Sequence, residues 1–147
     1  SHASALHGAG TRTERRLLPL SVTDRDESTT LSLQFDANGL IPAIVVDAAD
    51  NTVLMFAFMN AEALQKTLAS GRVHFYSRSR QKLWMKGETS GETFAVQQIL
   101  TDCDQDVLQV KVRAEGEGKA CHTGRRSCFY REISDGRLEF VANIGKP

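Results

Sequence analysis

The sequence has few cysteines and prolines, no long hydrophobic run and no excess of charge. Eighteen Lys and Arg balance eighteen Asp and Glu, so the formal net charge is zero. A general nucleic-acid or membrane-surface binder would carry a basic excess, and the balance argues against both. The longest apolar run, Val53 to Met59, is far shorter than the ~20 residues of a membrane span. Low glycine and proline contents argue against fibrous and low-complexity classes.

The cysteine count is also low: Cys103, Cys121 and Cys128 are the only three. A secreted domain held together by disulfides would normally carry more cysteines, in an even number. The first thirty residues contain no apolar stretch of signal-peptide length. We therefore expect a cytoplasmic protein with reduced thiols.

The length of 147 residues predicts a single domain, and 41% hydrophobic residues are enough for a modest core. Residues 1–30 are polar and lack periodicity, which indicates a flexible N-terminal arm with at most a weak helix or strand around Leu17 to Val22. The folded domain is expected over residues 31–147.

The hydrophobic pattern predicts an α+β domain of mainly antiparallel strands with one clear short helix. Asn60 is a suitable N-cap and Gly71 a suitable stop for a helix over residues 61–70, with Leu64 and Leu68 on its buried side. Asp135-Gly136 is a strong hairpin turn, whereas the charged, glycine-rich stretch 115–119 is expected to be flexible. Strands are predicted at 43–47, after Pro42, and at 53–58, 72–77, 82–86, 94–101, 107–114, 128–133 and 138–141.

The three cysteines are candidate zinc ligands. Cys121 and Cys128 are the first and last residues of the turn-prone stretch Cys-His-Thr-Gly-Arg-Arg-Ser-Cys. Cys103 lies eighteen residues before Cys121. Thiolates bind zinc well, and three protein ligands leave a fourth position for water, as in catalytic zinc sites. The spacing matches no double Cys-x-x-Cys signature, so three unrelated thiols are the alternative.

Asp102, Asp104 and Asp106 alternate around Cys103 and offer hard oxygen ligands suited to Mg²⁺. An EF-hand is excluded, because Val107 stands where that loop needs glycine and Arg113 where it needs glutamate. If the segment keeps the pleat of a strand, the carboxylates share one face and Cys103 points to the other. Cys103 is then free to join a different ligand set, including one on a second subunit. The alternative is a solvated acidic turn.

Two further features carry possible chemistry. His122 follows Cys121 and could ligate a metal or transfer protons, or could be a surface histidine. His74, in an apolar strand, is more typical of a packed, hydrogen-bonded residue. The second feature is a basic stretch that comprises Ser77, Arg78, Ser79, Arg80, Trp84, Lys86 and the loop 87–91 with Ser90. Arginine and serine side chains and glycine-rich loops suit phosphate groups, although a solvated charged edge strand gives the same pattern.

Taken together and in order, the motifs resemble phosphoribosyl-AMP cyclohydrolases over roughly residues 31 to 133. The motifs are Asn60-Ala61-Glu62-Ala63-Leu64, Ser77-Arg78-Ser79-Arg80, Leu83-Trp84-x-Lys86-Gly87-Glu88-Thr89-Ser90-Gly91, Asp102-Cys103-Asp104-x-Asp106 and Cys121-His122-Thr123-Gly124-Arg125-Arg126-Ser127-Cys128. Some family members are fused to a second pyrophosphohydrolase domain, and the end at Pro147 predicts a monofunctional chain.

The resemblance implies a hydrolase of histidine biosynthesis that opens the adenine ring of 1-(5-phosphoribosyl)-AMP between N1 and C6, giving the ProFAR imidazole carboxamide. It also implies zinc, Mg²⁺ and an intertwined homodimer. The implied zinc ligands are Cys103, facing the partner subunit, with Cys121 and Cys128. The implied Mg²⁺ ligands are Asp102, Asp104 and Asp106.

Our mechanistic hypothesis is that zinc-bound hydroxide attacks C6 and that His122 transfers a proton. The candidates for binding the substrate are Ser77, Arg78, Ser79, Arg80, Trp84, Lys86 and Ser90. No nucleic-acid or membrane partner is expected. Two alternatives stay open: a zinc-stabilised nucleic-acid-binding module, and another zinc hydrolase acting on a purine ring.

Overall fold

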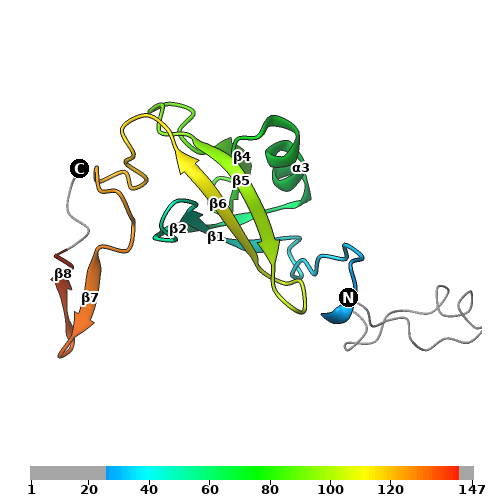
Figure 1. Ribbon diagram of the computed structural model, residues 1–147, viewed down its shortest axis with the longest axis horizontal. Helices are drawn as coiled ribbons and strands as arrows, with labels where there is room; N and C mark the ends of the chain where they lie inside the picture. Colours follow the sequence, from blue (N-terminus) through cyan, green and yellow to red (C-terminus); the bar gives the residue numbers. More distant parts are fainter. Residues whose placement is uncertain (1–25, 143–147) are drawn as a thin grey trace, which may run out of the picture.

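A four-stranded mixed sheet forms the centre of the protein (Figure 1). The structure, a computed structural model, describes residues 26–142. The sheet has the order β2-β1-β6-β5, in which β1–β2 and β5–β6 are antiparallel and β1–β6 is parallel. Its strands are β1 (Ile41–Asp47), β2 (Val53–Met59), β5 (Phe94–Thr101) and β6 (Leu108–Ala114).

The parallel pair makes the sheet mixed, although most of its pairings are antiparallel as predicted. In β1 and β6 every second side chain is buried, including Ala43, Val45, Val110 and Val112. This alternation gives the sheet one core-facing side. Pro42 lies inside β1 rather than before it. Pairing with β6 begins only at Ala43, so the proline does not interrupt the ladder between these strands.

The predicted helix is confirmed as α3 (Ala61–Ser70), with both of its caps. Asn60 Oδ1 accepts a hydrogen bond from the Ala63 N–H at 2.8 Å, and Gly71 ends the helix in the left-handed conformation at φ 76°. The predicted buried side is partly wrong. Leu64 packs against the core, but Leu68 is 63% exposed.

Thr67, fully buried, takes the core-facing position that the hydrophobic pattern assigned to leucine. Its hydroxyl donates to the Ala63 carbonyl at 2.8 Å and accepts from the His74 N–H at 2.9 Å. These bonds satisfy the buried hydroxyl and attach the helix to the next strand. Because a hydroxyl is not scored as hydrophobic, pattern analysis does not detect this contact.

Two short hairpins complete the domain: β3 (His74–Ser77) with β4 (Lys82–Met85), and β7 (Arg131–Ser134) with β8 (Arg137–Phe140). Phe75 of the first hairpin is fully buried in the core. The second hairpin extends away from the body of the domain (Figure 1). Asp135 and Gly136, with φ of 50° and 75°, form its predicted turn. His74 is packed and bonded, its Nδ1 lying 2.9 Å from the Arg72 carbonyl.

The segment that precedes β1, which includes Leu33 and Phe35, packs on the core. The weak element considered at Leu17 to Val22 lies outside the described residues. Leu33 and Phe35 pack against the core, and Gln105 bonds to the backbone of Ser32 and Gln34. Within residues 26–142 no helix is long and apolar enough to cross a membrane.

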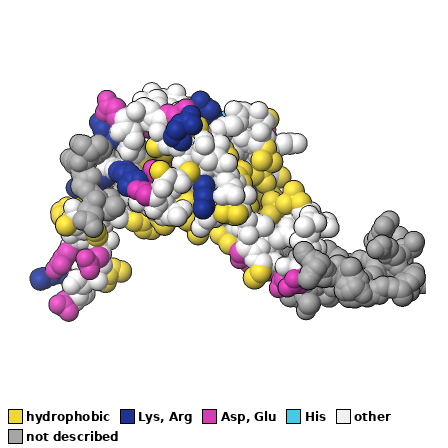
Figure 2. Space-filling view, viewed as in Figure 1, with side chains coloured by type: hydrophobic (Ala, Val, Ile, Leu, Met, Phe, Trp, Pro, Cys, Tyr) yellow, Lys and Arg dark blue, Asp and Glu magenta, His cyan; other side chains and the backbone are white. Residues whose placement is uncertain are grey.

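The surface retains large apolar side chains. Phe56 of β2 is 46% exposed and Leu100 of β5 is 38% exposed, and Ile133 and Phe140 of the second hairpin are more exposed still. Figure 2 shows hydrophobic atoms gathered along one side of the body rather than scattered evenly. Apolar surface gathered in this way is typical of a face that contacts another protein.

Candidate active site

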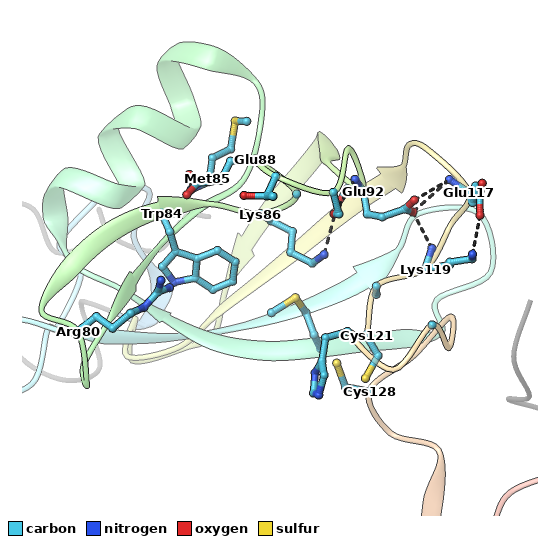
Figure 3. Close-up of a pocket in the computed structure, with 17 residues that line it drawn as sticks. Arg80, Trp84, Met85, Lys86, Glu88, Glu92, Glu117, Lys119, Cys121 and Cys128 are labelled. Carbon is cyan, nitrogen blue, oxygen red and sulfur yellow. Dashed lines mark hydrogen bonds and ion pairs between the residues drawn. The ribbon is translucent and has the colours of Figure 1, made fainter.

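A pocket of about 830 Å³ lies where β4, the loop that follows it, β2 and the cysteine loop meet (Figure 3). We use the name cysteine loop for residues 121–128. Trp84 and Lys86 line the pocket from the β4 side and Met55 from β2, while Cys121 and Cys128 line it from the cysteine loop. Apolar walls with a few convergent polar groups are typical of a small-molecule site.

The thiols of Cys121 and Cys128 lie side by side in the pocket (Figure 3). Burial acts to raise the pKa of Cys121. Hydrogen bonds from the Thr123 side chain and backbone, with contributions from Cys128 and the charge of Arg125, outweigh burial and bring the pKa below its usual 9.0. Thr123 Oγ1 lies 3.1 Å from the Cys121 sulfur. Burial and the neighbouring Cys121 raise the pKa of Cys128 to about 11. The two neighbouring thiols are therefore shifted in opposite directions, the pKa of Cys121 down and that of Cys128 up.

Lys86 places a buried cation close to these sulfurs. It is only 8% exposed, and its Nζ donates to the Glu92 carbonyl at 3.3 Å and lies 5.0 Å from the centre of the Phe94 ring. Burial lowers its pKa, while the charges of Cys128, Glu92 and Cys121 act in the opposite direction. Lys86 can therefore stabilise negative charge that develops in the pocket.

Glu92 holds the far rim of the pocket together. Its carboxylate accepts hydrogen bonds from the backbone N–H of Glu117 at 3.1 Å and of Lys119 at 2.9 Å. These bonds lower the pKa of Glu92. Stretch 115–119, which the sequence predicted to be flexible, is thus fastened to the loop after β4. A carboxylate that bonds to a distant backbone leaves no local sequence signal.

Only some of the residues predicted to bind substrate line this pocket. Arg80, Trp84, Lys86 and Ser90 do so, together with the predicted catalytic residue His122, which is exposed. Ser77, Arg78 and Ser79 are not among the lining residues. The guanidinium of Arg78 instead lies 4.3 Å from the centre of the Phe58 ring. The roles of these three residues stay predictions.

Sequence reasoning missed several residues that line the pocket: Met55, Glu92, Glu117 and Lys119. Lys119 adds a second lysine to the lining of the pocket, although its Nζ also pairs with Glu117 at 2.6 Å. The charged character of stretch 115–119 was visible in the sequence. What was missing was the contact with Glu92 that turns this stretch toward the site.

The acidic turn, residues 102–106, does not have the strand conformation that we considered. It joins β5 to β6 as a tight turn, in which Asp102 accepts from the Gln105 and Asp106 N–H groups and Gln105 has φ 58°. The predicted pleat, with Cys103 on the opposite face from the carboxylates, is therefore wrong, because this segment is not extended. The carboxylates converge through the turn instead.

The convergence of the carboxylates fits a hard cation. The oxygens of Asp102, Asp104 and Asp106 lie within 4.8 Å of one another. The hydrogen bond with Asp104, burial and the nearby carboxylates raise the pKa of Asp106. Asp104 Oδ1 is buried without a hydrogen-bond partner. Three repelling carboxylates with an unpaired buried oxygen are the arrangement that Mg²⁺ stabilises.

Cys103 is separated from the other two thiols within one copy of the chain. It is exposed in the acidic turn, before β6, whereas the cysteine loop comes after β6. The seven residues of β6 span about 20 Å. Within residues 26–142, the acidic triad is the one group of three or more possible metal ligands whose atoms converge. Cys121 and Cys128 suit zinc by their chemistry but make an incomplete set alone.

The fold and pocket define a small strand-rich domain with a site of paired thiols and one buried lysine. Comparison with known proteins identifies the family. The model of the family described as Phosphoribosyl-AMP cyclohydrolase matches residues 55–130. The chain belongs to this family, whose members are hydrolases. This membership favours the enzyme interpretation over a nucleic-acid-binding module.

Curated relatives are similar to this chain over most of its length. A protein of Chelativorans sp. (strain BNC1) is 60% identical over 120 residues, covering 80% of this chain and 86% of its own length. One from Hyphomonas neptunium is 56% identical over 123 residues, covering 84% and 92% respectively. One from Brucella anthropi is 56% identical over 108 residues, covering 74% and 77%. All three are named phosphoribosyl-AMP cyclohydrolase.

Proposed function

We propose that the protein hydrolyses the bond between N1 and C6 in the adenine ring of 1-(5-phosphoribosyl)-AMP, as a cytoplasmic enzyme of histidine biosynthesis. The observation that carries this proposal is the pocket in which Cys121, Cys128, His122 and Lys86 meet, in a chain that belongs to the cyclohydrolase family. Hydrolysis joins the oxygen of water to C6, breaks the C6–N1 bond and delivers a proton to N1.

The residues of the pocket suit the parts of this substrate. Arg80, Lys86 and Lys119 supply positive charge for phosphate groups. Trp84 offers an aromatic face on which a purine can stack, although its tilted contact with Phe75, at 5.0 Å between ring centres, also joins it to the core. His122, at the exposed side of the pocket, is our candidate for delivering the proton to N1.

Two metal sites belong to this proposal. Cys121 and Cys128 would hold zinc together with Cys103, and Asp102, Asp104 and Asp106 would hold Mg²⁺. When bound, zinc supplies a Lewis acid that lowers the pKa of water and so provides a nucleophile near neutral pH. Lys86 lies close enough to the thiols to balance part of their negative charge.

We further propose that each active site is built from two copies of the chain. Cys103 lies at the opposite end of β6 from the cysteine loop, so one copy does not bring the three thiols together. A second copy whose acidic turn approaches the pocket would supply both the third thiol and the carboxylates. The exposed apolar side chains of β2 and β5 support such an association.

An absorbance assay of ring opening with purified protein, combined with metal analysis, tests the activity. We expect Cys121→Ala to lose zinc and turnover together, because it removes one ligand of an already small set. His122→Ala should keep its zinc and lose activity by about 100-fold or more, as expected for a general acid. If Cys121→Ala kept both its zinc and its turnover, the assignment would be refuted.

A further inference from the structure

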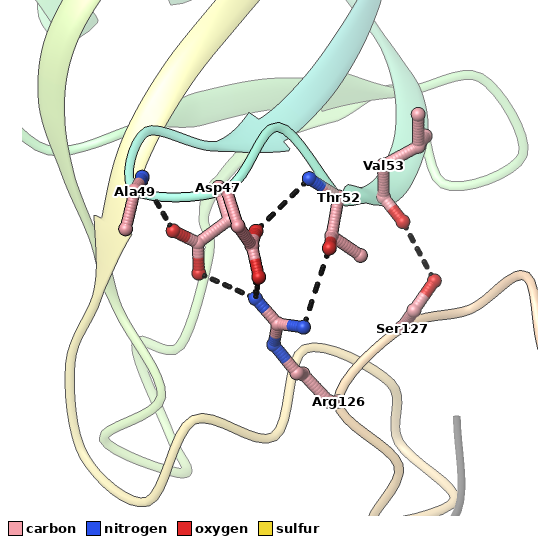
Figure 4. Close-up of polar contacts among 7 residues, drawn as sticks. Asp47, Ala49, Thr52, Val53, Arg126 and Ser127 are labelled. Atoms are coloured by element: carbon pink, nitrogen blue, oxygen red, sulfur yellow. Dashed lines mark hydrogen bonds and ion pairs between the residues drawn. The ribbon is translucent and has the colours of Figure 1, made fainter. Parts of the chain in front are cut away.

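We propose that Arg126 is a positioning residue that holds Cys121 and Cys128 in place by fastening the cysteine loop to the turn between β1 and β2. Arg126 lies inside this loop, but it does not line the pocket. Its side chain points to the other side, toward the turn that ends β1 (Figure 4). The inference rests on the proposed function in one respect, since it takes the two thiols to be part of the active site.

One nitrogen of the Arg126 guanidinium makes most of the contacts. Nη2 donates to Asp47 Oδ2 at 3.0 Å and to both carboxylate oxygens of Asp50, at 3.0 and 2.9 Å. Nη1 donates to Thr52 Oγ1 at 3.3 Å. Two carboxylates and a hydroxyl thus surround one guanidinium, and hydrogen bonds to charged groups are stronger than neutral ones.

The acceptors are themselves held in place. Asp47 Oδ1 accepts from the Ala49 N–H at 2.8 Å, and Asp50 Oδ1 accepts from the Thr52 N–H at 3.0 Å. These bonds orient both carboxylates independently of Arg126. The Asp47 side chain is only 18% exposed, so its bond to Arg126 is less weakened by solvent than a surface ion pair.

The next two residues continue the attachment into β2. Ser127 is almost fully buried, and its hydroxyl donates to the Val53 carbonyl at 2.7 Å (Figure 4). The N–H of Cys128 donates to the Leu54 carbonyl at 2.8 Å. Three consecutive residues, ending at a pocket thiol, are therefore fixed to β2 and the turn before it.

Cys121, at the other end of the loop, depends on this attachment indirectly. Its N–H donates to the Arg125 carbonyl at 3.0 Å, and its carbonyl accepts from the Gly124 N–H at 2.9 Å. The backbone bond thus joins Cys121 to the residue immediately before Arg126. Displacing Arg126 should therefore shift both thiols. Groups that orient metal ligands from outside the ligand set commonly alter metal affinity by 10- to 100-fold when mutated.

The first test measures the reactivity of each thiol in the metal-free, full-length protein. Alkylation of Cys121, which is only 7% exposed, is followed by peptide mass spectrometry in wild type, Arg126→Ala and Asp47→Asn. We expect Cys121 to react several-fold faster in both variants, because the loop opens locally. Arg137→Ala, which removes an exposed arginine from β8, is the control and should leave the rate at Cys121 unchanged. An unchanged rate at Cys121 would overturn the proposal.

The second test measures zinc affinity by competition with a chelator. We expect Arg126→Ala to lose about 10- to 100-fold and Arg126→Lys to lose less, because it keeps the charge but not the forked geometry. Arg137→Ala, which removes an exposed arginine from β8, is the matched control and should bind zinc like wild type. Zinc affinities of the two Arg126 variants equal to that of wild type would contradict the proposal.

A double variant tests whether Arg126 and Asp47 act through a single contact. If Arg126 and Asp47 act through one contact, the double variant Asp47→Asn/Arg126→Ala should lose no more zinc affinity than the worse single variant, whereas independent effects would add. Additive losses would count against the proposal. If Arg126→Ala does not fold, Arg126→Lys and Asp47→Asn are judged by the same thiol and zinc criteria. Neither test uses the substrate, so a failed ring-opening assay would leave this result interpretable.

Discussion

At Gly87, two backbone segments of the pocket wall approach each other closely. Gly87 follows Lys86 at the start of the loop after β4, with φ 82°, a conformation that residues with side chains rarely adopt. A Cβ at this position would also collide with the backbone of Glu92 and Thr93. Glycine is therefore required here both for its conformation and for the close approach of two backbone segments.

We expect Gly87→Ala to destabilise the protein by about 1–3 kcal/mol, because strain and a backbone collision combine. It should also weaken substrate binding, since the loop that carries Lys86 and Glu92 would have to move. Urea unfolding and KM measure the two effects. Gly91→Ala is the matched control, having a similar φ of 83° but nothing within 4 Å of the new Cβ. Equal losses in the two variants would argue against the collision.

At the scale of elements, α3 is positioned by its two caps and by one buried hydroxyl rather than by a continuous apolar stripe. Asn60 and Gly71 fix the ends, and Thr67 joins the helix to β3. The hydrophobic pattern identified the helix and its bounds but misplaced Leu68. Which side of a short helix is buried depends on the elements that the helix packs against. Here the bond between Thr67 and His74 of β3 sets that side.

We expect Asn60→Ala to cost about 1 kcal/mol in the free energy of unfolding, because it leaves the Ala63 N–H without its capping acceptor. Leu68→Gln should change stability by less than about 0.5 kcal/mol, since that side chain is mostly exposed. Urea unfolding monitored by circular dichroism measures both. A larger loss for Leu68→Gln than for Asn60→Ala would show that the helix buries a different face.

Glu115 connects the end of β6 to the segment before β3 and gives a prediction on pH. Its carboxylate accepts from Thr93 Oγ1 at 2.6 Å and pairs with Arg72 at 2.8 Å. The bond from Thr93, followed by the charges of Arg72 and Arg113, lowers its pKa below the usual 4.5. Stability from this group is therefore present above about pH 4.5 and is lost as the pH falls through the folded-state value.

We accordingly expect Glu115→Gln to lower the melting temperature near neutral pH and to show a smaller further decrease between pH 5 and acid than wild type. Arg72→Gln removes one partner of the same carboxylate and should also flatten the profile. Thermal melting across this pH range provides the measurement. Parallel profiles for wild type and Glu115→Gln would mean that this carboxylate contributes nothing to acid sensitivity.

For the whole molecule, the separation between the acidic turn and the cysteine loop is the main constraint on function. The two lie at opposite ends of β6, and each has only part of the proposed site. An arrangement with two copies also gives a role to the exposed apolar side chains of β2, β5 and the β7–β8 hairpin.

Mixing two inactive variants tests this arrangement. Cys103→Ala and Cys121→Ala should each be inactive alone. Subunits unfolded and refolded together should regain activity, because each mixed dimer has one site with Cys103 from one copy and an intact Cys121–Cys128 pair from the other. Refolding each variant separately, followed by mixing without exchange, is the control. If the site formed within one copy, co-refolding would restore no activity.

The local patterns in the sequence determined the elements and the chemical types of the site residues. Asn60 and Gly71 set the helix, Asp135-Gly136 set a hairpin, and the cysteines and aspartates marked the candidate metal ligands. These features depend on backbone preferences and donor chemistry within a few residues, which order along the chain preserves.

Only the tertiary structure decided which of these residues meet. It put β1 parallel to β6, folded the acidic segment into a turn, placed Arg78 on Phe58 and brought Glu92 to stretch 115–119. It also joined Arg126 to Asp47, across 79 positions of the chain. Such contacts depend on how strands pair and loops cross in space, and no local preference of the backbone encodes them.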